Sequence, residues 1–101
     1  MYLIQILLPL YDNAGKPLSS ELFARVRAEL TERYGGLTAY SRSPAQGLWK
    51  DRGETVHDDI VVFEVMADAL DRGWWRHYRQ SLEAAFRQDT IMVRAQAVIP
   101  L

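Results

Sequence analysis

The stretch VHDDIVVFEV, residues 56–65, decides the fold, because it is a β-rich apolar run that carries a carboxylate inside it. Every second residue from Val61 to Val65 is apolar and can face a core, whereas Glu64 points to the other side of the strand. A charged residue is tolerated there only if its face is not the helix-packed core and if hydrogen-bond donors lie nearby. We therefore predict a sheet with two chemically different faces.

Four segments of the chain are predicted strands. They cover, in chain order, residues 2–10, 37–43 with a continuation at 47–50, 55–66 and 91–99. Pro9 should lie at the end of the first strand, since proline cannot donate to a strand ladder. Pro44–Gly47 interrupts the second strand, and Gly53 suits the hairpin turn at 51–53 that leads into the third.

Two segments repeat apolar residues every three or four positions, which is typical of helices that bury one face. Ser19 or Ser20 can cap the first helix, and the glycine pair at 35–36 ends it. Asp68 or Asp71 can cap the second. The predicted inner faces are Leu22, Phe23, Val26, Leu30 and Tyr34 in the first helix, and Trp75, Tyr78, Leu82, Ala85 and Phe86 in the second.

The resulting order, β-α-β-β-α-β, is that of a ferredoxin-like α+β domain spanning residues 1–101. Right-handed crossovers place both helices on one face of an antiparallel sheet, with strand order 4-1-3-2. All four strands can be phased so that their helix-facing side is apolar. That side carries Ile4, Ile6, Leu8, Leu37, Ala39, Val61, Phe63, Val65, Ile91, Val93, Ala95 and Ala97.

The same phasing gives the composition of the opposite, open face of the sheet. It carries Leu3, Gln5, Leu7, Thr38, Tyr40, Arg42, Ile60, Val62, Glu64, Met66, Met92, Arg94, Gln96 and Val98. So many apolar side chains form a patch of the kind that monomers avoid exposing. We therefore predict a homodimer that packs through this face.

Composition excludes several other classes of protein. The chain is 49% apolar and 25% charged, which is typical of a globular protein, and it has no cysteine. A formal net charge of −1, with Gln5 and Glu64 where RNA-binding sheets carry aromatics, argues against nucleic acid. The longest apolar run is too short to span a membrane, and residues 2–12 lack a basic leader. We expect a cytoplasmic protein with no membrane partner.

The first candidate site combines Glu64 with Arg94, Gln5 and Gln96 on the open face. A carboxylate in an apolar chamber can act as a general base, and Arg94 could hold an anionic substrate or stabilise an enolate oxygen. The alternative is a polar network that only fixes the register of a dimer. The sequence leaves both roles open.

Two further groups are weaker candidates. His57 could act as an acid or base beside Asp59, but the pair has no third ligand, so we predict no metal site. These residues could equally form a solvated strand start. Tyr40, Arg42 and Trp49 could line the mouth of a chamber and stack on an aromatic ligand, although such residues are also enriched at protein interfaces. We predict no cofactor.

The segments RYGGLTAYSRSPAQGLWKDRGETVHDDIVVFEV (33–65), WW (74–75) and YRQSLEAAFRQDTIMVRA (78–95) resemble a family of small uncharacterised bacterial proteins. The element order and the apolar open face resemble the dimeric α+β-barrel superfamily. That resemblance implies two ferredoxin-like subunits around a chamber, and the superfamily includes cofactor-independent monooxygenases, haem-degrading monooxygenases and isomerases. Such a fold alone does not select a reaction.

Two functions therefore stay open. One is a small-molecule-binding homodimer that could act as a cofactor-independent enzyme, monooxygenase- or isomerase-like, on a small aromatic or anionic compound in a sheet-lined pocket. The other is a non-catalytic structural or interaction protein whose open face is only a dimer interface. Replacing Glu64 by glutamine would separate them.

Overall fold

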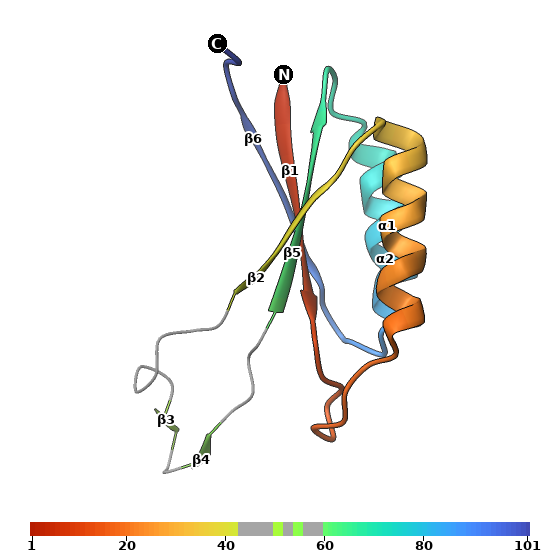
Figure 1. Cartoon of the computed structure of the whole chain (residues 1–101), viewed down its shortest axis with the longest axis vertical. Coiled ribbons are helices and arrows are strands. Elements are labelled where there is room, and N and C mark those ends of the chain that lie inside the picture. The colour runs from red at the N-terminus through yellow and green to blue at the C-terminus, as the bar shows by residue number, and fades with distance from the viewer. Residues whose placement is uncertain (43–49, 52–53, 56–59) are drawn as a thin grey trace.

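The computed structural model describes residues 1–42, 50–51, 54–55 and 60–101. Its main body is a four-stranded antiparallel sheet with both helices on one face (Figure 1). The elements are β1 (Tyr2–Pro9), α1 (Ser20–Tyr34), β2 (Thr38–Arg42), β3 (Lys50–Asp51), β4 (Glu54–Thr55), β5 (Ile60–Ala67), α2 (Arg72–Ala85) and β6 (Met92–Ala97). The sheet order β2-β5-β1-β6 confirms the predicted ferredoxin-like α+β fold.

The third predicted strand differs in detail from the prediction. It was expected as one run over 55–66, whereas β4 and β5 are separate, and residues 56–59 between them lie outside the described residues. β3 pairs with β4, with Lys50 opposite Thr55 and Asp51 opposite Glu54. The predicted hairpin is therefore present, but Asp51 belongs to the ladder rather than to the turn, because pairing continues one residue further.

The tertiary structure selects one cap from each predicted pair. The Ser19 hydroxyl accepts a hydrogen bond from the Glu21 amide at 3.2 Å, and the Asp71 carboxylate accepts one from the Trp74 amide at 3.0 Å. Gly35 ends α1 in the left-handed conformation, with φ of 75°, which a glycine adopts without strain. Both helices therefore begin at local sequence signals, and α1 also ends at one.

The core lies between the helices and the sheet, as the apolar phasing predicted. Its buried members are Ile4, Ile6, Leu8, Val26, Leu30, Phe63, Val65, Ala67, Trp75, Tyr78, Leu82, Phe86 and Ile91. Three alanines expected on this side, Ala39, Ala95 and Ala97, are exposed instead. They lie on the edge strands β2 and β6, where a short side chain does not reach the helices.

Tyr78 on α2 buries its hydroxyl without a hydrogen-bond partner among the described residues. This burial raises the pKa of the Tyr78 phenol, and the Glu29 carboxylate adds to the rise. The unfolded chain loses this proton near pH 10, whereas the folded protein retains it, so the free energy of unfolding should fall as the pH rises above about 10.

Tyr78→Phe is therefore expected to make the stability less sensitive to alkaline pH. At about pH 8 the variant should be as stable as the parent or more so, because it removes a buried hydroxyl that has no hydrogen-bond partner in the described part of the chain. Urea unfolding of both proteins at about pH 8 and about pH 10.5 measures the difference. An equal alkaline loss in the two proteins would contradict the assignment to Tyr78.

Candidate functional site

The candidate site lies on the open face of the sheet, opposite the side that α1 and α2 cover (Figure 1). The strand registers align Thr38 on β2 with Glu64 on β5, Glu64 with Gln5 on β1, and Gln5 with Arg94 on β6. One row of polar residues therefore crosses all four strands at the same height. Regular antiparallel pairing is enough to position it, because residues opposite each other share a face.

A continuous chain of hydrogen bonds runs along this row. The Arg94 Nε donates to Gln5 Oε1 at 2.8 Å, and the Gln5 Nε2 donates to Glu64 Oε1 at 2.7 Å. The Tyr40 hydroxyl reaches the same Glu64 oxygen from β2, also at 2.7 Å. The Gln5 amide thereby links the guanidinium to the carboxylate, and two donors converge on Glu64 Oε1.

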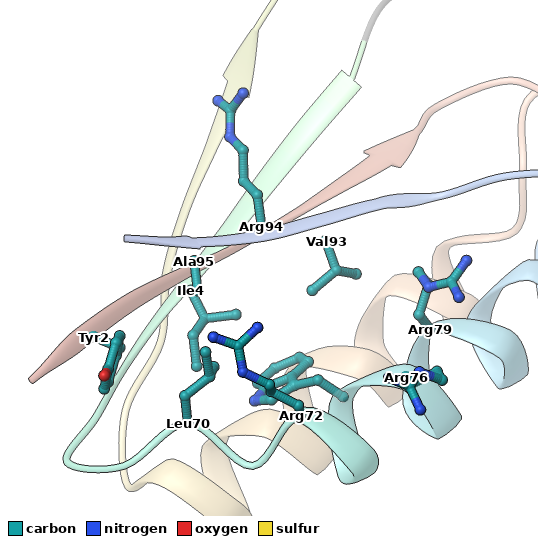
Figure 2. Close-up of a pocket in the computed structure, with 10 residues that line it drawn as sticks. Tyr2, Ile4, Leu70, Arg72, Arg76, Arg79, Val93, Arg94 and Ala95 are labelled. Atoms are coloured by element: carbon teal, nitrogen blue, oxygen red, sulfur yellow. The ribbon is translucent and has the colours of Figure 1, made fainter. Parts of the chain in front are cut away.

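The two ends of this chain keep free hydrogen-bonding capacity. Glu64 Oε2 accepts no hydrogen bond from the described residues, and the terminal nitrogens of Arg94 have no partner among them. Figure 2 shows Arg94 projecting from β6 on the side away from α2, so its guanidinium belongs to the open face. The row thus offers one acceptor and one cationic donor group, both held in place by Gln5.

The polar row lies in an apolar field. Val62 is only 1% exposed although it belongs to the open face, whereas Tyr40, Met66 and Met92 are 42%, 42% and 53% exposed. The next row along the sheet runs Tyr40, Val62, Leu7 and Met92. A ligand on this face could contact the exposed Tyr40 and Met92 of that row, beside the polar groups.

Among the described residues, the other predicted site residues form no part of the hydrogen-bonded row around Glu64. Gln96 pairs with Leu3 on the neighbouring row and does not hydrogen-bond to Glu64; with Gln5 and Arg94 it borders a shallow hollow of about 230 Å³. Arg42 ends β2 opposite Ile60. His57 and Trp49, and with them Asp58 and Asp59, lie outside the described residues.

The strand phasing predicted Tyr40 on the same face as Glu64, where the two can converge, and grouped it with the residues at the mouth of a chamber. The direct cross-strand neighbour of Glu64 is Thr38, and Tyr40 lies two residues further along β2. An aromatic side chain can reach a diagonal neighbour at that spacing. The sequence therefore contained both partners of this hydrogen bond, but the contact could be inferred only once the register between β2 and β5 was known.

Within the described residues, no cluster of three acidic or histidine side chains could hold a metal ion. In the same part of the chain, no helix has both the length and the apolar character needed to cross a bilayer.

Comparison with known proteins supports the fold. No protein-family model matches the chain, and no curated protein matches it either. Among solved structures, the chain is similar to a phage SAM lyase in complex with S-methyl-5′-thioadenosine, with a TM-score of 0.60 and 15% sequence identity. The match covers 94% of this chain and 79% of that one. At this identity the likeness concerns the arrangement of helices and strands, and the resemblance to the dimeric α+β-barrel superfamily stays a prediction.

Proposed function

We propose that the open sheet face binds a small organic molecule, with Glu64 and Arg94 as its polar anchors. The observation that carries the proposal is the hydrogen-bonded row from Arg94 through Gln5 to Glu64, which leaves Glu64 Oε2 unoccupied among the described residues. Preorganised polar groups inside an apolar field are typical of small-molecule sites. The ligand class that fits is a small, largely apolar compound with a donor group for Glu64 and an anionic group or carbonyl for Arg94.

The same arrangement suits cofactor-independent proton transfer. Glu64 Oε2 could accept a proton from a carbon next to a carbonyl, and Arg94 could stabilise the negative charge that the proton leaves on the carbonyl oxygen. Returning the proton to a different atom would complete an isomerisation. Gln5 contributes by holding both groups, since its amide contacts each of them.

We further propose that a second copy of the chain closes the open face. The exposed Met66 and Met92 on either side of the polar row support this, because a protein normally covers such side chains. A homodimer formed through this face would remove water from around Glu64 and strengthen its interactions with a bound ligand. Trp49 and Arg42 stay candidates for the mouth of that enclosure, and His57 stays a candidate acid or base.

The likeness to the phage SAM lyase suggests the first ligands to try, S-methyl-5′-thioadenosine and SAM. Glu64→Gln is expected to weaken the binding of a ligand found in this way by roughly tenfold or more, because a hydrogen bond to a carboxylate is replaced by one to a neutral amide. The variant retains an acceptor oxygen for Gln5 and Tyr40, so fold and assembly should persist. Isothermal titration measures the affinity.

The matched control is Glu32→Gln, which removes the same charge from the exposed surface of α1. Its ligand affinity should stay within about twofold of the parent protein. Binding that both variants leave unchanged would show that the ligand does not use Glu64. For a purely structural role, we expect Glu64→Gln to change stability or assembly, and native mass spectrometry should find the purified protein without a retained small molecule.

A further inference from the structure

A second hollow lies on the other side of β6, between that strand and α2. It encloses about 350 Å³, at the lower end of the range for small-molecule sites. Figure 2 shows Ile4 and Val93 reaching from the sheet toward α2, with Leu70 and Tyr2 at one end. Its walls therefore include several apolar side chains, and Arg94 and Ala95 of β6 border it on the side of the Glu64 row.

Three arginines of α2 border this hollow, at positions 72, 76 and 79. Arg79 is neutralised by Glu83 at 3.1 Å, but Arg72 and Arg76 have no ion-pair partner among the described residues. Like charges at i and i+4 on a helix repel each other, and a cation in the first turn opposes the helix dipole. Arg72 and Arg76 therefore lie where α2 by itself would disfavour them.

Figure 2 also shows Arg72 extending from the start of α2 toward β6, across the hollow rather than away from it. An anion between Arg72 and Arg76 would relieve both unfavourable interactions at once. Guanidinium groups bind carboxylates and phosphates through paired hydrogen bonds, so these two arginines suit such a group. The N-terminus of α2 is the positive end of the helix dipole, so it also attracts an anion.

Trp75 adds an aromatic wall to the hollow. It lines the hollow and is 5% exposed, yet its indole Nε1 has no hydrogen-bond acceptor among the described residues. Nε1 itself is closed off from the hollow, so a ligand there would meet the indole ring of Trp75 rather than its N–H group.

We propose that the hollow between α2 and β6 is a second binding site, for a small amphipathic anion. Its carboxylate or phosphate group binds Arg72 and Arg76, and its apolar body packs against Ile4, Val93 and Trp75. A small molecule fits better than a macromolecule because the site is a hollow of limited size rather than an extended charged surface. Arg94 borders this hollow and also belongs to the Glu64 row, whereas Arg72 and Arg76 border only the hollow, so variants of these two arginines test this site without altering the row.

Titration of the ¹⁵N-labelled full chain with 4-phenylbutyrate, followed by NMR, tests the proposal. The Trp75 indole signal, assigned by its loss in Trp75→Phe, should shift saturably with the probe. The double variant Arg72→Gln/Arg76→Gln should weaken binding roughly tenfold or more, because charge-assisted hydrogen bonds are about twice as strong as neutral ones. The neutral analogue 4-phenylbutanol should bind correspondingly less well, and phenyl phosphate in place of the carboxylate identifies the preferred anion.

The matched control is Arg25→Gln/Arg87→Gln, which removes the same charge from exposed positions outside the hollow. It should bind the probe within about twofold of the parent protein. The proposal is overturned if the Trp75 indole does not shift saturably with either anion, or if the alcohol binds as tightly as the carboxylate. It is equally overturned if the two double variants bind the probe with the same affinity.

Discussion

Phe86→Ala is expected to lower the free energy of unfolding by about 3–5 kcal/mol. Phe86 follows the last residue of α2, is fully buried, and packs the edge of its ring on Phe23 with centroids 5.3 Å apart and planes at 79°. Truncation loses apolar burial and leaves a cavity between α1 and α2 that the surrounding residues refill only in part. Small domains are stable by only about 5–15 kcal/mol, so most of the stability would be lost.

Urea unfolding at a fixed protein concentration measures this change through the midpoint and the slope of the transition. Ile99→Ala is the control, since Ile99 is 87% exposed and its truncation should cost less than about 0.5 kcal/mol. Phe86→Leu should recover more than half of the loss, because leucine refills much of the cavity. A loss below about 1 kcal/mol for Phe86→Ala would contradict the role of this ring as a central core residue.

Met66→Asp is expected to raise the dissociation constant of the proposed homodimer by about a hundredfold or more. Met66 is 42% exposed on the open face, two residues along β5 from Glu64. In a symmetric interface each copy would bury the new carboxylate close to an existing one, and a buried charge without a partner is strongly unfavourable. Sedimentation velocity over a range of concentrations measures the dissociation.

Ala28→Asp serves as the control for the added charge, because Ala28 lies on the exposed side of α1, away from the open face. We expect this variant to associate like the parent protein. A dimer that tolerates Met66→Asp would mean that the subunits meet elsewhere, at a sheet edge or through the helices. A parent protein that stays monomeric at high concentration would leave the open face for a different protein to cover.

Part of the candidate site could be predicted from sequence because strand periodicity is local. Glu64 among alternating apolar residues was enough to assign it to the face away from the helices, and the same phasing put Gln5 and Arg94 on that face. The hydrogen bond from Tyr40 to Glu64 could not be predicted, since it depends on the register between β2 and β5 and on the reach of an aromatic ring. The hollow beside Arg72 was missed for a similar reason: it exists only where α2 and β6 meet.

The sequence by itself determined the order of the elements, the inner face of each helix and the two unlike faces of the sheet. These follow from repeats of two and of three to four residues, and from glycine and capping residues, all of which act over a few positions. Only the tertiary structure decided that Ser19 and Asp71 are the caps, that Gln5 joins Arg94 to Glu64, and that Arg72 faces an apolar hollow. The caps are local contacts for which the sequence offered two candidates each, whereas the contacts of Gln5 and the hollow beside Arg72 join segments far apart in the chain. The geometry of those distant contacts is set by packing, which local patterns do not encode.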